Sequence, residues 1–88
     1  MQSLLIGEAV SDPDQQAITK AITETTGVEQ LIHLRTQHLG PDDILVGAKV
    51  VFDATLDGVG IAETIDRIEQ DIRLVVPSAH PIYVEPVS

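Results

Sequence analysis

Residues 44–53 read ILVGAKVVFD, and this stretch decides the fold. Its side chains alternate as expected of a strand whose successive residues point to opposite faces of a sheet. One face is wholly apolar and consists of Ile44, Val46, Ala48, Val50 and Phe52. The other face is mixed and consists of Leu45, Gly47, Lys49, Val51 and Asp53. The stretch therefore predicts a strand with one side buried under another layer and the other side open to solvent or a partner.

A second strand is predicted just before it, over residues 28–39, and the turn Gly-Pro-Asp-Asp at 40–43 separates the two. In strict alternation one face of this strand carries Leu31, His33, Arg35 and Gln37, and the other carries Ile32, Leu34, Thr36 and His38. His33 and His38 are five residues apart, so a regular strand places them on opposite faces.

A helix is predicted on the N-terminal side of these strands. Asp12 is the expected cap, Pro13 fits the first helical position, and Gly27 suits a left-handed stop. The apolar stripe at helical spacing consists of Ile18, Ala21, Ile22 and Thr25. A helix that buries such a stripe needs a partner layer, which the apolar face of the strands supplies.

The C-terminal half predicts a second helix and a last strand. After a loop at 54–60, the clearest helical stripe of the chain consists of Ile61, Ile65, Ile68, Ile72 and Val75. Pro77 ends this helix, and residues 82–85 form a strand. The order is α-β-β-α-β, which predicts an α+β two-layer sandwich with both helices on one face of a three-stranded sheet. A further strand at residues 3–6 is also considered.

Composition excludes several classes of function. The 88 residues suit one domain, and a net charge of −9 with only five Lys and Arg argues against nucleic acid as a partner. Without cysteine there are no disulfides, thiolate metal sites or thiol catalysis. No serine lies in a nucleophile motif, and the glycines at 58 and 60 lack the rest of a nucleotide fingerprint, so we expect no enzyme.

Imidazole and carboxylate groups on the predicted sheet are candidate ligands for a divalent cation. The candidates are His33, His80, Glu85 and His38. Zinc binds such groups at about 2.0–2.2 Å and is the preferred ion, while manganese or magnesium wants more oxygen ligands. Because His33 and His38 point to opposite faces, we favour His33 with Tyr83, Glu85 or His80, within one chain or across a two-fold axis.

Several short segments together resemble a known family. They are residues 4–9 (LLIGEA), 27–28 (GV), 32–36 (IHLRT), 40–41 (GP) and 82–86 (IYVEP). In order and spacing they are similar to the cytoplasmic C-terminal domain of cation diffusion facilitator transporters. The resemblance implies a ferredoxin-like (metallochaperone-like) unit that follows the last membrane helix, dimerises, and senses or binds the exported cation. The implied partners are a second copy, the transporter's transmembrane domain and divalent cations.

The chain departs from that family's usual metal pattern. Members with a binuclear zinc site tend to read His-Asp-Leu-Arg where residues 32–35 read Ile-His-Leu-Arg. They tend to carry a histidine where Lys49 aligns, and a final His-x-acid-Pro run where Tyr83 replaces the histidine and Glu85 keeps the acid. The chain therefore resembles a variant branch that lacks the usual histidine ligands.

Three hypotheses of function follow. The first is a cytoplasmic dimeric regulatory domain of a divalent-cation exporter, with the dimer interface at Leu45, Val51 and Tyr83. The second is a metal-free dimerisation module, including a stand-alone protein of the same fold, and the third is a small-molecule-binding regulatory domain. We expect residues 1–10 to be a lead from a preceding membrane segment and residues 11–88 to form the domain.

Overall fold

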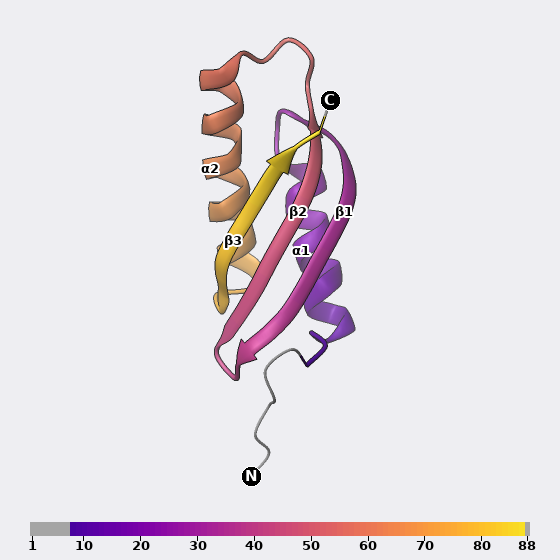
Figure 1. Ribbon diagram of the computed structural model, residues 1–88, viewed down its shortest axis with the longest axis vertical. Coiled ribbons are helices and arrows are strands. Elements are labelled where there is room, and N and C mark those ends of the chain that lie inside the picture. Colours follow the sequence, from indigo (N-terminus) through magenta and orange to yellow (C-terminus); the bar gives the residue numbers. More distant parts are fainter. Residues whose placement is uncertain (1–7, 88) are drawn as a thin grey trace.

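A computed structural model describes residues 8–87 and contains five elements in the order α-β-β-α-β, as predicted. They are α1 (Asp12–Glu24), β1 (Val28–Gly40), β2 (Asp43–Phe52), α2 (Gly58–Val75) and β3 (Ala79–Pro86). The strands lie side by side in one layer, with α1 passing behind β1 and β2, and α2 flanking β3 (Figure 1). The fold is the ferredoxin-like two-layer sandwich that the sequence predicted.

The sheet has the order β1-β2-β3. β1 and β2 are antiparallel neighbours joined by a tight turn, whereas β2 and β3 are parallel and connected through α2. The central strand β2 buries the whole of its predicted apolar face, namely Ile44, Val46, Ala48, Val50 and Phe52. The prediction of a one-sided strand is confirmed, and the helices cover this side alone.

The core is a layer of isoleucines between the helices and β2. Ile18 and Ile22 of α1 and Ile68 and Ile72 of α2 are fully buried. The predicted stripe of α2 was wrong at its end, because Val75 is 51% exposed. The next residue, Val76, caps the helix and is buried instead, which continues the stripe one position further at a step of four.

Both helices begin earlier than predicted, because other residues cap them. Ser11, and not Asp12, caps α1, since its hydroxyl accepts the Asp14 N–H at 3.4 Å. α2 begins three residues earlier than predicted, because the Asp57 carboxylate accepts the Gly60 N–H at 2.8 Å and caps the helix. Side-chain caps of this kind satisfy N–H groups that have no partner inside the helix.

Gly27 has the left-handed backbone that was expected, with a φ of +99°, but it turns the chain towards β1 and does not end α1, which stops at Glu24 with Thr25 as its cap. The cap residue Thr25 is buried, and its hydroxyl oxygen lies 2.7 Å from the Ala21 carbonyl oxygen. Its hydroxyl also donates to an Asp71 carboxylate oxygen at 2.8 Å. The end of α1 is therefore fastened to α2 by a polar contact at the margin of the apolar core.

β1 is longer than its partner because it contains three irregularities. Its 13 residues pair with the 10 of β2, and register shifts fall at Glu29, Ile32 and Leu39. The shift at Ile32 corrects one prediction, since Leu31 pairs with Val50 and packs against the core, opposite to the face of His33. Bulges in an edge strand change the facing of residues and discourage pairing with other chains.

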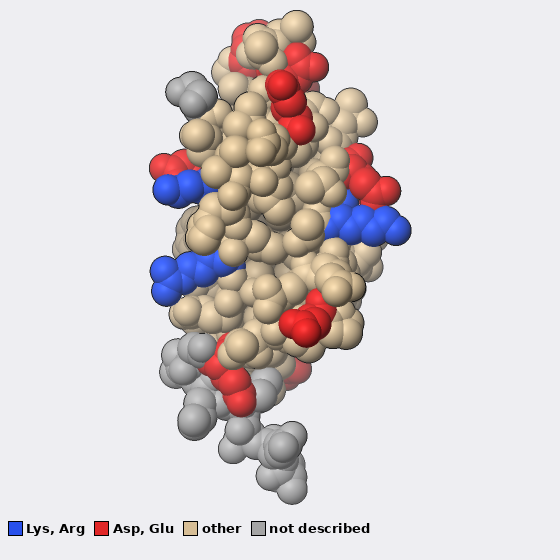
Figure 2. Space-filling model, turned by 90° about the vertical axis from the view of Figure 1, so that its right-hand side faces the viewer, with Lys and Arg blue, Asp and Glu red and all other residues tan. Residues whose placement is uncertain are grey.

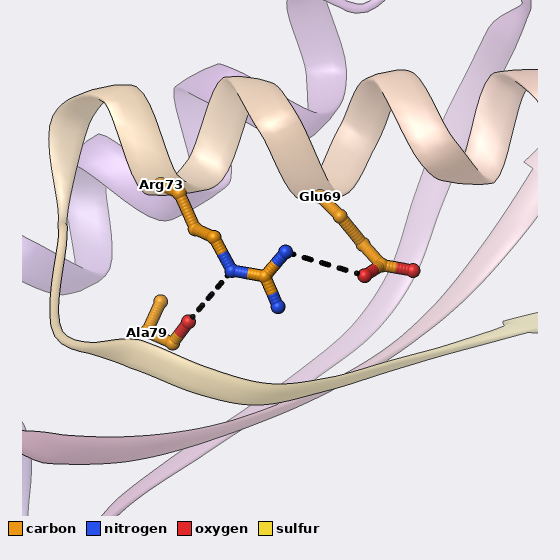
Figure 3. A network of polar contacts seen from close by, with 3 residues as sticks. All are labelled: Glu69, Arg73 and Ala79. Carbon is orange, nitrogen blue, oxygen red and sulfur yellow. Dashed lines mark hydrogen bonds and ion pairs between the residues drawn. The ribbon is translucent and has the colours of Figure 1, made fainter.

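β3 begins at Ala79, three residues before the predicted start, and continues to Pro86. Its entry is held by Arg73 in the last turn of α2 (Figure 3). The Arg73 Nε donates to the Ala79 carbonyl at 3.3 Å, and the guanidinium lies 3.5 Å from Glu69. A cation at a helix C-terminus also complements the helix dipole, so this residue joins two elements.

The segment before α1 packs onto the domain. Val10 is 3% exposed and belongs to the core, and the Glu8 carbonyl accepts the His38 N–H of β1 at 2.9 Å. The considered strand at residues 3–6 lies outside the described residues. No helix within residues 8–87 has the length and apolar character to cross a membrane.

Candidate functional site

The candidate site lies on the sheet face away from the helices, hereafter the open face. The register places on it His33, Arg35 and Gln37 of β1, Leu45, Gly47, Lys49 and Val51 of β2, and Tyr83 and Glu85 of β3. No helix covers these residues, since the buried core lies on the opposite side of the sheet. The open face thus combines the predicted ligands and the predicted interface residues.

His33, Lys49 and Glu85 form one row across the open face. Lys49 pairs with His33 on one side and with Glu85 on the other. Two strand spacings therefore separate His33 from Glu85, about 10 Å between backbones. The Lys49 Nζ lies 3.9 Å from a Glu85 carboxylate oxygen, and both side chains are more than half exposed. A protein ammonium group thus stands between the two preferred ligands.

The other two candidate histidines lie elsewhere. His38 pairs with Ile44 on the helix side of the sheet, so the predicted opposition of His33 and His38 is confirmed. Its Nδ1 lies 3.1 Å from the Gly40 carbonyl. His80 is exposed near the start of β3, level with Ile44, at the other end of the strands from His33. Of the four candidates, the register therefore brings His33 and Glu85 into one row of the open face, whereas His80 lies near the other end of the strands.

A single chain does not assemble a metal centre in the part that the structure describes. Among residues 8–87, no three His, Cys, Asp or Glu side chains come close enough to hold one ion. A site built on His33 and Glu85 would need further ligands from a second copy. A zinc site usually has four ligands, and His33 and Glu85 of one chain lie too far apart to share one ion, so each would need a partner residue from the second copy.

The predicted interface residues are also on the open face. Leu45 and Val51 are half-buried, towards opposite ends of β2, and Tyr83 is 64% exposed beside Gly47. An exposed aromatic ring with flanking aliphatic side chains is typical of protein interfaces. Other exposed apolar residues lie on the helices, among them Leu74 at 81%.

Three residues of this face were not singled out as functional in the sequence, namely Arg35, Gly47 and Lys49. With His33, Tyr83 and Glu85 they line a hollow of about 420 Å³. The sequence does indicate these residues through their spacing. His33 and Arg35 are two residues apart on one predicted strand, as Gly47 and Lys49 are on the next, so each pair lies on one face of its strand. Recognising the hollow requires the register, which places Arg35 opposite Gly47 and His33 opposite Lys49.

The fold and the open face define a small ferredoxin-like domain with an uncovered polar sheet surface. Residues 10–87 match the family model described as "Cation efflux protein, cytoplasmic domain". The chain belongs to this family, which confirms the resemblance found in the sequence. The description assigns the family to the cytoplasmic part of cation efflux proteins.

Solved structures show the same fold. A nickel form of a variant of the MamM CTD has a TM-score of 0.79 and 19% identity, over 89% of this chain and 98% of that one. A cadmium form has a TM-score of 0.78 and 19% identity, over 88% and 95%. A copper form has a TM-score of 0.78 and 20% identity, over 86% and 94%. No curated protein matches the sequence significantly.

Proposed function

We propose that this chain is the cytoplasmic dimerisation and regulatory domain of a divalent-cation efflux transporter. Cation binding would favour one arrangement of the two copies and so bias the transmembrane domain to which they belong. The observation that supports this is the open face, which carries Leu45, Val51 and Tyr83 together with His33 and Glu85. A stable interface buries roughly 800 Å² on each partner, and a three-stranded sheet face is of that order.

A two-fold arrangement would complete the site that one chain leaves incomplete. With the axis parallel to the strands, β1 of one copy lies over β3 of the other. His33 then faces Glu85 of the second copy, and the same pair recurs on the other side of the axis, so there are two sites, each with one imidazole and one carboxylate from protein and the other positions open to water. Imidazole and carboxylate from two copies form a donor set that suits zinc, the ion we prefer.

A cation changes the conformation of the dimer if it binds more tightly to one arrangement of the two copies than to the other. A cation that bridges the copies stabilises the closed arrangement by its difference in affinity for the two states. Variants of the MamM CTD have been solved in nickel, cadmium and copper forms, which supports the choice of a divalent transition metal as ligand. The ammonium of Lys49 competes with the metal ion for the Glu85 carboxylate, so it lowers the affinity of the site for zinc.

The experiment is a calorimetric titration of zinc into chelator-stripped protein, with the mass of the particle measured in parallel by light scattering. His33→Ala should abolish binding, and Lys49→Ala should tighten it by about twofold to fivefold, the value of an exposed ion pair. His80→Ala is the matched imidazole control and should leave the affinity unchanged. Unaltered zinc affinity in His33→Ala would contradict the site.

The interface has its own test with a matched pair of leucines. Leu45→Glu places a charge on the open face and should convert the dimer to a monomer, because an unpaired charge is costly to bury. Leu74→Glu places the same charge on an exposed position of α2 and should leave the dimer intact. The reverse result would move the interface to the helices.

A metal-free dimerisation module is the second candidate, and the ion pair between Lys49 and Glu85 favours it. In that case the Lys49 ammonium, and not a metal ion, neutralises the Glu85 carboxylate on the open face. A flat zinc titration for both the wild type and Lys49→Ala, with the dimer preserved, would establish this candidate over the first.

A further inference from the structure

The hollow on the open face has the size of a site for a small ligand. Its volume of about 420 Å³ falls within the usual range for ligand pockets, roughly 300–1,000 Å³. Gly47 forms its floor in the middle of the sheet, with Arg35 on the neighbouring strand to one side and Tyr83 on the other. His33, Lys49 and Glu85 line it one row further along.

The glycine at this floor is required neither by the backbone nor by packing. Among the described residues only Gly27 has a positive φ, so Gly47 has the ordinary backbone of a strand. A Cβ at this position would meet nothing closer than the Arg35 carbonyl oxygen at 4.0 Å, an ordinary contact. Glycine weakens a strand and often marks the close approach of a ligand, so room above Gly47 is its evident use.

The side chains around the hollow carry a surplus of positive charge. Arg35 and Lys49 face one acid, Glu85, in a chain whose net charge is −9. Within residues 8–87 the Arg35 guanidinium makes no hydrogen bond or ion pair, and the contact of Lys49 with Glu85 is long and exposed. Basic side chains project at the left margin of Figure 2, the side on which the open face lies.

These observations favour an anion over Gly47 and Arg35, one row along the strands from the row of His33, Lys49 and Glu85 in which the proposed function places a cation. A guanidinium binds carboxylate and phosphate groups with two parallel hydrogen bonds. The Lys49 ammonium turns from Glu85 to a ligand at little cost, because exposed ion pairs are weak. The acidic remainder of the chain opposes an anion only weakly, since salt screens charges beyond about 8 Å.

We propose that the hollow over Gly47 binds a small anion with two or more carboxylate or phosphate groups. Arg35 holds one group, Lys49 and His33 hold the second, and Tyr83 borders the ligand on the β3 side. The site is separate from the helices and needs no metal. The hollow lies on the same face as the interface of the proposed function, so an anion bound over Gly47 and a second copy seated there would exclude each other.

The test is a calorimetric titration of metal-stripped protein with citrate and with pyrophosphate at constant ionic strength. Saturable binding is expected, and Arg35→Gln should weaken it about tenfold, the loss of one charge-assisted contact. Lys20→Gln removes an exposed cation from α1 and should have no effect. Citrate against pyrophosphate decides between carboxylate and phosphate as the preferred group, and binding of either supports the site.

Gly47→Val provides a second test, because it fills the hollow without removing a charge and should abolish binding. Its fold is checked by circular dichroism, and Arg35→Gln carries the test if it does not fold. Equal effects of Arg35→Gln and Lys20→Gln would show non-specific attraction and overturn the proposal, as would a flat titration with both anions.

The two roles of the open face separate at Lys49. Lys49→Gln should weaken the binding of the anion and strengthen the binding of zinc, since the ammonium attracts one and competes with the other. A protein that does not bind zinc but binds citrate through Arg35 would refute the cation site and leave the anion site standing.

Discussion

Gly27 is the position at which one added methyl group tests the packing of the α1–β1 turn against α2. Its φ is +99°, and a Cβ there would lie 3.0 Å from the Thr64 Oγ1, 3.1 Å from the Thr64 Cγ2 and 3.3 Å from Leu56. Thr64 is fully buried, with its hydroxyl donating to the Gly60 carbonyl at 2.7 Å and accepting from Arg67 at 3.0 Å. The threonine is therefore held in place and yields little.

Two costs add up in Gly27→Ala. A non-glycine residue in a left-handed conformation costs about 1–2 kcal/mol, and overpacking costs about 1–3 kcal/mol. The reduced entropy of the unfolded chain returns about 0.4–1 kcal/mol. We expect the free energy of unfolding to fall by about 2–4 kcal/mol, a large part of the roughly 5–15 kcal/mol of a typical domain.

The assay is urea unfolding followed by far-UV circular dichroism at one fixed protein concentration. With a slope of about 1–3 kcal/mol per molar urea, the midpoint should fall by about 1 M or more. Gly58→Ala is the control, because a Cβ there has nothing within 4 Å, and it should stay within about 0.5 kcal/mol of the wild type.

A double variant separates the two costs. In a Thr64→Ala background the two Thr64 atoms are gone and only the 3.3 Å approach of Leu56 remains, so the cost of Gly27→Ala should fall towards the backbone part, about 1–2 kcal/mol. An unchanged stability of Gly27→Ala, or an equal cost in both backgrounds, would refute the steric reasoning.

Three further outcomes are expected. Ile72→Ala should cost about 2–5 kcal/mol in urea unfolding because the side chain is fully buried, whereas Leu74→Ala, two residues along and 81% exposed, should stay within about 0.5 kcal/mol. The pKa of Asp53 is lowered from 3.8 by the Thr55 N–H and hydroxyl, so its stabilisation is complete above pH 3.8 and is lost as the pH falls through the folded-state pKa. Carboxyl NMR titration measures this pKa, and Asp53→Asn should remove that part of the acid sensitivity. Ser11→Ala should cost about 0.5 kcal/mol, the low end for a cap, since its bond is long and exposed.

The element order and the core were predictable because they depend on local pattern. The alternation over 44–53 and the isoleucine steps in α2 each reflect a single period, which the sequence displays directly. The errors lie where a contact between elements decides which residue is buried. Val76 is buried in place of Val75, because the chain leaves the helix there and turns towards β3. Helix starts also moved, because Ser11 and Asp57 act as caps.

The site was predictable only in part. His33 and Glu85 were assigned to the sheet, but their common face and the distance between them depend on the strand order. Lys49 lies between them because β2 is the central strand of the sheet. The order of the elements along the chain does not by itself specify which strand is central. The hollow depends on Gly47, and a glycine without side chain gives no chemical signal in a sequence.

Because of the bulge at Ile32, the number of a residue in β1 no longer tells by strict alternation which face of the sheet it occupies. A histidine displaced by one place would normally turn to the opposite face. An unpaired residue beside it absorbs that displacement, so His33 still reaches the open face opposite Lys49. Ligands in related domains are therefore best compared by the β2 residue they pair with. An edge strand of this kind tolerates small insertions while the surface it presents stays the same.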